Sequence, residues 1–356
     1  MQTRVNKLAA ALKDNALDAL LVLQPENRFY LSGFTGDAGA LLITAGQSFL
    51  IADFRFMEQA REQSPHLTII KMETTLATAL ADMAGRLNLS ALGFEADYIS
   101  YKFYDTLHEK LDQVTLRPVD GIVEQFRLIK DKDELAAIQK AMTLLDEGFK
   151  HICNFIKPGI SEREVALELE MFMRRRGAEK TAFPFIVASG PRAALPHGEA
   201  SEKNINPGDV ITLDFGVVTD GYNSDMTRTV SLGAPNAQIK QIYGIVLEAQ
   251  LAGLAAVKAG VAASAVDKAA RDVITSHGYG EYFGHSTGHG VGLAVHEGPR
   301  ISSRDDTILR EGMVITVEPG IYLPGTGGVR IEDSLVVEKD GCRLLTKSPK
   351  DYLIEL

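Results

Sequence analysis

Four acidic residues and one histidine in the second half of the chain have types and spacing that suit metal binding. Two of the acids, Asp214 and Glu318, lie in near-copies of the pattern Gly-x-Val-Ile-Thr-x-acid-x-Gly, which begins at Gly208 and recurs 104 residues later at Gly312. Each copy is therefore expected to present one carboxylate at the same point of an equivalent strand. Two carboxylates related by a pseudo-twofold axis form a cavity that attracts cations.

A second acid follows each of these two strands after a turn. Asp225 follows the glycine-containing turn at 220–221, and Glu332 follows the glycine-rich segment 324–328. If each turn reverses the chain, Asp214 and Asp225 lie side by side on adjacent antiparallel strands, within reach of one ion. Glu332 then mirrors Asp225 in the second copy.

The histidine, His289, lies between the two copies in the segment 284–292, Gly-His-Ser-Thr-Gly-His-Gly-Val-Gly. Glycines permit a close approach of backbone to a site, and His289 is the expected nitrogen ligand. Four carboxylates and one imidazole supply more oxygen than a structural zinc site takes. They suit two divalent ions of the harder first-row type, with Mn²⁺ preferred and Co²⁺ or Zn²⁺ as alternatives.

Two such ions about 3.5–4 Å apart would share a hydroxide and clamp both oxygens of a hydrolytic intermediate. The alternative interpretation of any single acid is a surface charge or a capped turn. The set differs, because an acid on an apolar strand such as 210–215, Val-Ile-Thr-Leu-Asp-Phe, is costly to bury without compensation. The pattern therefore predicts a dinuclear metal site.

The repeated pattern extends beyond the acids to the elements that must position them. Residues 157–160, Lys-Pro-Gly-Ile, match residues 258–261, Lys-Ala-Gly-Val, at an offset of 101 residues. Self-similarity at a nearly fixed period predicts a duplicated unit. Each half would contain a helix end, a glycine turn, a second helix and then the strand that bears the acid. Chance recurrence of short Gly/Val patterns explains one match better than two matches in the same order.

The first part of the chain alternates helical and extended patterns, which predicts a self-contained α/β domain. We expect helices at 5–13, 54–63, 75–87 and 101–111, and strands at 19–23, 40–43, 48–52, 67–70, 92–94 and 114–117. A turn cluster at 118–121 precedes a long helical pattern at 131–156. The predicted domains are therefore residues 1–125 and 126–356.

Composition restricts the class of partner. The 356 residues are 45% hydrophobic and carry a formal net charge of -10, which favours a large core and disfavours nucleic acid or an anionic membrane as partner. The only cysteines, Cys153 and Cys342, support neither a disulfide framework nor a thiolate zinc site. Residues 1–12 lack the apolar core of a signal peptide, and no apolar stretch reaches the ~20 residues of a membrane span. A soluble cytoplasmic protein is expected.

The ordered set of acids and histidine resembles the metal ligands of the pita-bread metallopeptidases, which include methionine aminopeptidase, prolidase and Xaa-Pro aminopeptidase. The proline-specific members are most similar, through Ser-Asp-x-Thr-Arg-Thr at 224–229, Gly-His-x-x-Gly-His-Gly at 284–290, Val-His-Glu at 295–297, Val-Glu-Pro-Gly at 317–320 and Val-Arg-Ile-Glu-Asp at 329–333. Residues 27–34, Asn-Arg-Phe-Tyr-Leu-Ser-Gly-Phe, resemble the creatinase/prolidase N-terminal domain. The resemblance implies an α/β N-terminal domain, an α+β pita-bread catalytic domain with internal pseudo-twofold duplication, and a homodimer.

The same resemblance implies a role for each ligand. Asp225 would bind one ion in bidentate fashion together with Asp214, which bridges. His289 would bind the other ion, and Glu332 would bridge on the opposite side. Glu318 would be a ligand that also exchanges a proton with the attacking hydroxide.

Other positions match residues of the family that face the substrate or support the site. His197 matches the substrate-facing histidine, and His296 matches the histidine that stabilises the tetrahedral intermediate or the substrate carbonyl. His285 matches a wall of the pocket for proline. The remaining substrate-side and supporting residues are Arg330, Tyr222 and Tyr322.

The favoured function is hydrolysis of an Xaa-Pro bond at the N-terminus of small peptides. That bond has no N–H at its nitrogen, so a metal pair that activates the carbonyl is an effective way to cleave it. The sequence leaves open dipeptidase or aminopeptidase action, the preferred Xaa side chain and the native metal.

The sequence disfavours three other functions. A methionine aminopeptidase or a broader N-terminal exopeptidase is disfavoured by the extra N-terminal domain and by Arg228. A non-catalytic peptide-binding module on the same fold has lost metal ligands, and a metal-free creatinase-like hydrolase lacks this acid set, whereas all five ligands are present here.

Overall fold

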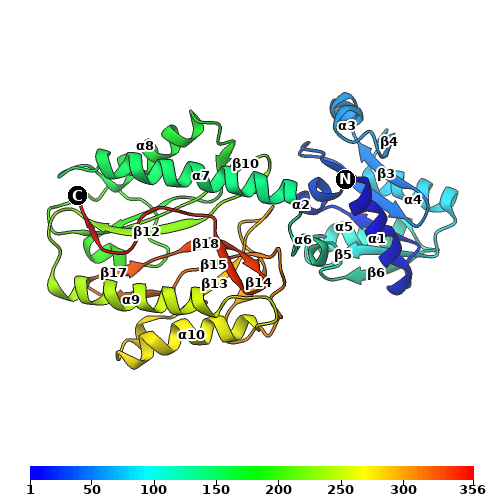
Figure 1. Cartoon of the computed structure of the whole chain (residues 1–356). Helices are drawn as coiled ribbons and strands as arrows, with labels where there is room; N and C mark the ends of the chain where they lie inside the picture. Colours follow the sequence, from blue (N-terminus) through cyan, green and yellow to red (C-terminus); the bar gives the residue numbers. More distant parts are fainter. The chain divides into compact units, whose positions relative to one another are not determined.

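The computed structural model describes all 356 residues, which form two compact units, Met1–Arg127 and Leu128–Leu356 (Figure 1). None of the helices is both long enough and apolar enough to cross a membrane. Each unit has its own sheets and its own buried core, so each is described by itself.

The first unit is built on one six-stranded mixed sheet with strand order β4-β3-β2-β1-β5-β6. Its strands are β1 (Ala19–Val22), β2 (Ala40–Thr44), β3 (Ser48–Ala52), β4 (Thr68–Lys71), β5 (Ala91–Glu95) and β6 (Thr115–Val119). Its helices are α1 (Gln2–Asp14), α2 (Pro25–Ser32), α3 (Met57–Gln63), α4 (Leu76–Leu87), α5 (Tyr101–Lys110) and α6 (Glu124–Arg127). Apolar side chains of β1, β2, α4 and α5, such as Leu21, Leu42, Leu80 and Leu107, form its core.

All six predicted strands of this unit are present, whereas the helical prediction needs a correction at 54–63 and lacks two helices, α2 and the short α6. The helix expected at 54–63 begins as a short 3₁₀ turn, Phe54–Phe56, in which the Asp53 side chain accepts a hydrogen bond from the N–H of Arg55, and α3 follows it. Helix α2 has no predicted counterpart. Pro25 in its first turn and Gly33 just past its end, at φ 74°, are ordinary signals for the start and stop of a helix.

The second unit has four long helices: α7 (Lys132–Phe155), α8 (Glu162–Arg174), α9 (Ala237–Ala256) and α10 (Ala263–Ser276). Helices α7 and α8 lie on one side of its strands, and α9 and α10 lie on the other (Figure 1). Capping boxes formed by Asp131 with Glu134 and by Ser161 with Glu164 fix where α7 and α8 begin. The long helix predicted at 131–156 is thereby confirmed.

Two larger sheets and two smaller ones lie between these helices. The first has the order β20-β12-β9-β8, and the second β14-β13-β15-β18-β19. Their strands are β8 (Ile186–Ser189), β9 (Val210–Phe215), β12 (Met226–Ser231), β13 (Gly288–Gly290), β14 (Glu297–Ile301), β15 (Val314–Val317), β18 (Asp333–Glu338), β19 (Gly341–Leu344) and β20 (Ile354–Glu355). The smaller sheets contain β7 (Lys180–Thr181), β10 (Val217–Thr219) and β11 (Tyr222–Asn223), and β16 (Gly320–Leu323) and β17 (Gly327–Arg330).

The two halves of this unit share local geometry that supports the predicted duplication. Gly159 and Gly260 have φ values of 87° and 88°, and each donates its N–H over 2.9 Å, to Ile205 and Leu309 respectively. In each half the strand of the repeated pattern pairs antiparallel with the third strand after it, β9 with β12 and β15 with β18. Duplication stays a prediction that these equivalences favour.

The two repeated acids are equally far from the start of their strands, since β9 begins at Val210 and β15 at Val314, but the two strands end differently. Asp214 lies within β9, whereas β15 ends at Val317, one residue before Glu318. Pro319 follows Glu318 and has no N–H to donate to a strand ladder, which explains why this strand stops earlier.

Candidate metal centre

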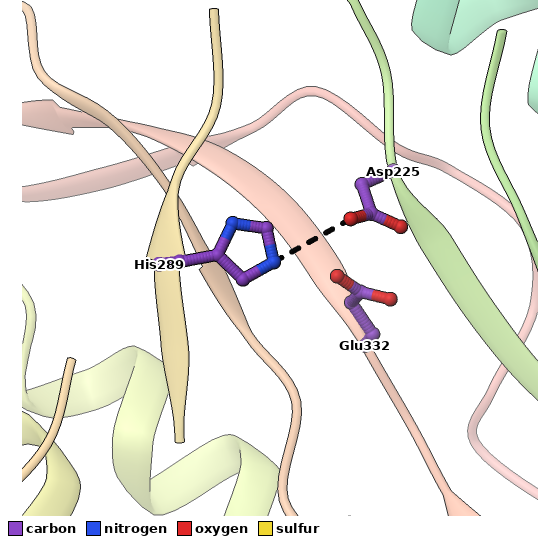
Figure 2. Close-up of side chains that lie close together, drawn as sticks. All are labelled: Asp225, His289 and Glu332. Atoms are coloured by element: carbon purple, nitrogen blue, oxygen red, sulfur yellow. Dashed lines mark ion pairs between the residues drawn. The ribbon is translucent and has the colours of Figure 1, made fainter. Parts of the chain in front are cut away.

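Asp225, His289 and Glu332 converge although they are far apart in the sequence. One ligand atom from each lies within 4.8 Å of the other two. Figure 2 shows the three side chains pointing toward one another from separate segments. Asp225 directly precedes β12, His289 is the middle residue of β13, and Glu332 directly precedes β18.

Glu318 joins this group through the imidazole. Nε2 of His289 lies 3.3 Å from Oε1 of Glu318 and 3.5 Å from Oδ2 of Asp225. The other ring nitrogen, Nδ1, donates over 3.0 Å to the carbonyl of Gly290. That hydrogen bond places the ring proton on Nδ1 in the neutral imidazole, so the lone pair of Nε2 faces the acids, as a metal ligand requires.

The glycines on both sides of His289 are required by the close approach of neighbouring strands. A Cβ atom on Gly288 would lie 2.1 Å from the carbonyl oxygen of Thr316, and one on Gly290 would lie 2.1 Å from that of Gly298. Any larger residue would push β13 away from β15 or β14. The predicted tight backbone around His289 is therefore confirmed.

Asp214 reaches the site from the adjacent strand. In the ladder of β9 and β12 it pairs with Thr227, and Asp225, two residues earlier, points to the same face of the sheet. Oδ2 of Asp214 accepts a hydrogen bond of 2.6 Å from Nη2 of Arg330. The hydroxyl of Thr227 donates over 2.8 Å to Oε2 of Glu332, which ties the two copies together.

Two carboxylate oxygens of this group are buried and accept no hydrogen bond: Oδ1 of Asp214 and Oε1 of Glu332. An unpartnered buried acceptor is destabilising by about 1–3 kcal/mol, and by more when it carries charge. A cation bound between these oxygens would remove that penalty. Oxygen atoms from carboxylates with one imidazole nitrogen form a donor set that suits hard divalent ions, so the residues fit the metal that the sequence predicts.

Burial of four acids around one histidine changes the acid–base properties of the group. Burial raises the pKa of Asp225 to about 7, against the opposing contact with His289. Burial, with the charges of Asp225 and Glu318, raises the pKa of Glu332 well above its usual range. Burial lowers the pKa of His289, but Asp225 and Glu318 outweigh it and raise the pKa to about 9. Without metal the site holds protons that a bound cation would displace.

A chain of hydrogen bonds links His285 to the acid cluster. The hydroxyl of Tyr322 lies 2.8 Å from Nε2 of His285, and Nη1 of Arg330 donates to that hydroxyl over 2.9 Å. Arg330 is buried and continues the chain to Asp214. Since burial lowers the pKa of His285, and its Nδ1 donates to the carbonyl of Ser286, Nε2 accepts from Tyr322.

The other two predicted histidines are exposed beside the cluster. The rings of His296 and His289 have centroids 4.3 Å apart at 76°, an edge-to-face contact. Burial, together with the charge of His289, lowers the pKa of His296, and His197 acts in the same direction. Both His197 and His296 are exposed to solvent, so both are accessible to an incoming molecule.

Tyr222 is the predicted residue that the structure does not bring to the cluster. Its hydroxyl donates over 2.9 Å to Oε1 of Glu134, on α7, and its side chain is buried. The next residue, Asn223, donates to the carbonyls of Gly292 and Leu293 and so holds the chain after β13. This hydroxyl therefore supports the fold in the structure.

Two threonines near the acids were not singled out by the sequence analysis. The hydroxyl of Thr316 donates over 3.1 Å to Oε1 of Glu318 and accepts from the N–H of His289. Thr227 bonds Glu332, as described above. Both lie two residues from an acid of the set, Thr227 inside the motif at 224–229 and Thr316 inside the repeated pattern at 312–320, and that spacing was the available signal.

Comparison with known proteins decides the family. Residues 136–339 match the sequence model of metallopeptidase family M24, and residues 4–129 match that of the creatinase/prolidase N-terminal domain. The chain belongs to metallopeptidase family M24. The predicted family, the pita-bread catalytic fold and the metallopeptidase class are confirmed, and a divalent metal requirement follows from the family.

Relatives of this M24 peptidase match it over nearly its whole length. The Xaa-Pro dipeptidase of Pyrococcus horikoshii is 42% identical over 357 residues, which cover 99% of each protein. The structure of the Xaa-Pro dipeptidase from Bacillus anthracis is similar with a TM-score of 0.97 at 46% identity, over 99% of both chains. An X-Pro aminopeptidase from Thermotoga maritima gives a TM-score of 0.90 at 39% identity, over 95% of this chain and 98% of that one.

Proposed function

We propose that this M24 peptidase hydrolyses the Xaa-Pro bond at the N-terminus of small peptides, Xaa-Pro dipeptides included. The relatives described above are dipeptidases and an aminopeptidase named for that bond. The observation that carries the proposal is the buried pair of unpartnered oxygens, on Asp214 and Glu332, inside a cluster with His289 and Asp225. Unpartnered buried oxygens lower the stability of the fold, whereas a metal-dependent reaction uses them as ligands.

The proposed ligands are Asp214, Asp225, His289, Glu318 and Glu332, and the proposed ions are two Mn²⁺, with Co²⁺ or Zn²⁺ as alternatives. When bound, such ions supply a nucleophile at neutral pH and withdraw electrons from the scissile carbonyl. Arg330 orients Asp214, and Thr227 orients Glu332, each through a direct hydrogen bond. These contacts keep the carboxylates facing the site before a substrate arrives.

Glu318 is the proposed proton carrier among the acids. Its side chain is 17% exposed, against 13% for Asp214 and 7% for Asp225, and it lies beyond the end of its strand. The hydroxyl of Thr316 holds its Oε1. A held carboxylate with access to the substrate can take a proton from the nucleophile and pass it to the leaving nitrogen of proline.

The exposed histidines supply the remaining interactions with the peptide. An Xaa-Pro bond offers no N–H for recognition, so a peptidase for that bond must bind the carbonyl and the proline ring. We assign contact with the carbonyl to His197 and His296, since both are exposed and His296 packs against His289. His285, held by Tyr322, forms a wall for the ring.

The substrate class is tested with Ala-Pro, Ala-Pro-Ala and Met-Ala-Ser in the presence of Mn²⁺ or Co²⁺. We expect release of alanine from one or both proline peptides, measured by chromatography of the products. Cleavage of Ala-Pro alone identifies a dipeptidase, and cleavage of Ala-Pro-Ala identifies an aminopeptidase. A preference for Met-Ala-Ser, or no cleavage of either proline peptide, would reject the proposal.

A second prediction separates substrate contact from metal binding. The His197→Ala variant is expected to lose turnover of the proline peptide by about 10²-fold, the usual range for one acid–base or polar group. Its metal content, measured by elemental analysis, should equal that of the wild type. His277→Ala, which removes an exposed histidine paired with Glu248, is the control and should keep full activity. Loss of metal from His197→Ala would contradict the assigned role.

A further inference from the structure

Glu162 is a fully buried acid outside the metal cluster. It is the first residue of α8, and its side chain has no exposed surface. Its Oε1 accepts from the N–H and from the hydroxyl of Ser189, each over 2.8 Å. Its Oε2 accepts from the N–H of Ser201 over 3.1 Å, from its hydroxyl over 2.6 Å, and from Nη1 of Arg192. Both oxygens of this carboxylate thus accept hydrogen bonds, and the donors belong to three residues.

The three residues that donate to Glu162 lie at the two ends of one segment, residues 190–200, and within it. Ser189 directly precedes this segment, Ser201 directly follows it, and Arg192 lies on the 3₁₀ turn inside it. The carboxylate therefore closes the segment at its base, as a clamp between its two ends. The residue presented at the exposed tip is His197.

The tip of the segment is attached on the other side to the acid cluster. Nη1 of Arg330 donates over 3.2 Å to the carbonyl of Pro196, next to His197, while Nη2 of the same side chain bonds Asp214. The position of His197 relative to the acids thus depends on Arg330 at the tip and on Glu162 at the base.

The energetics indicate that the charge of Glu162 serves this segment. An ionised carboxylate is costly to bury unless donors surround it, and here two backbone amides, two hydroxyls and a guanidinium do so. The start of α8 does not need it, because Ser161 and Glu164 already cap that helix. An amide of the same shape would turn an NH₂ group toward donors of Ser201 and Arg192.

We propose that Glu162 is a positioning residue, which sets the place of His197 for catalysis by holding residues 190–200. The inference rests on the proposed function, since it assigns Glu162 an effect through the proposed role of His197. A displacement of about 1 Å at a group that contacts the reacting bond costs on the order of 10²-fold in rate. Glu162 touches no proposed metal ligand, so its effect should be separate from metal binding.

The test compares Glu162→Gln with a matched control on the same helix turn, Glu164→Gln. With the proline peptide that the wild type cleaves, Glu162→Gln is expected to lower kcat by about 10- to 100-fold with little change in KM. Glu164→Gln should behave as wild type, because glutamine also completes a capping box. Metal affinity, measured by calorimetry, should be the same in all three proteins.

A double-mutant cycle shows whether Glu162 acts through His197. In the His197→Ala background, Glu162→Gln is expected to cost almost nothing further, because the residue it positions is absent. Amide hydrogen exchange, which needs no activity, should be faster in residues 189–201 of Glu162→Gln and unchanged in His197→Ala. Additive losses, or a fall of metal affinity in Glu162→Gln, would overturn the inference.

A second variant serves if Glu162→Gln does not fold. Ser201→Ala removes one donor from the same carboxylate and should show a smaller loss of the same kind.

Two outcomes distinguish failure of this inference from failure of the proposed function. If wild type cleaves no Xaa-Pro peptide, the proposed function is rejected and the inference falls with it. If wild type is active and the cycle is additive, only the inference is rejected.

Discussion

The Glu318→Ala variant, loaded with Mn²⁺, is expected to hydrolyse its proline peptide at least about 10³-fold more slowly than wild type. Glu318 lies directly after the end of β15 and is the least buried of the acids compared above. Its removal takes away both a metal contact and the group proposed to carry the proton. The measurement is kcat from the release of free proline.

The control for that experiment is Glu311→Ala, which removes an exposed acid from the turn before β15 and should leave kcat unchanged. Metal content of Glu318→Ala is measured in parallel, because three other acids and His289 remain to hold ions. A variant with full metal content that still turns over at one tenth of the wild-type rate or faster would show that Glu318 is not the proton carrier.

Removal of divalent ions by a chelator is expected to abolish hydrolysis, and addition of Mn²⁺ should restore it. The physical reason is that Asp214 and Glu332 keep unpartnered buried oxygens, which serve no purpose without a cation. A chelated protein that retains full activity would contradict the metal site.

The Asp225→Asn variant, which lacks one acid of the cluster, should recover less activity than wild type at equal added Mn²⁺.

The stabilisation that metal provides is expected to grow with pH. In the metal-free protein the pKa of Asp225 is raised from 3.8 to about 7 and that of His289 from 6.5 to about 9. Both groups bind more protons in the folded than in the unfolded state, so their contributions to stability are lost as pH rises through these values. Metal replaces those protons. The increase of Tm on adding Mn²⁺ should therefore be larger near pH 9 than near pH 6, and equal shifts at both would contradict it.

The convergence of Asp225, His289 and Glu332 could be predicted because local patterns mark the segments that carry them. The acid strands are marked by the repeated pattern, and the close approach at His289 is marked by its glycines. The early end of β15 was not predicted, although Pro319 after Glu318 is a local signal for a strand that ends early.

Contacts between distant segments could not be predicted from the sequence. Tyr222 was expected near the site, but its hydroxyl donates to Glu134, a residue 88 positions earlier on helix α7. The role of Glu162 was not predicted either, because an acid at the start of a helix is common. Only the tertiary structure shows that it accepts hydrogen bonds from Ser189 and Ser201. Hydrogen bonds of this kind depend on the packed arrangement and leave no periodic pattern.

The glycines that flank His289 divide the site by how much change each part tolerates. Around β13 there is no room for even one carbon atom on Gly288 or Gly290, so random variation there removes function almost regardless of the residue introduced. The tip of the 190–200 segment is the opposite, since Leu195 is 52% exposed and its side chain is free to vary. Libraries that aim to alter which Xaa residue is accepted should therefore vary Leu195 and leave His197 and the glycines untouched.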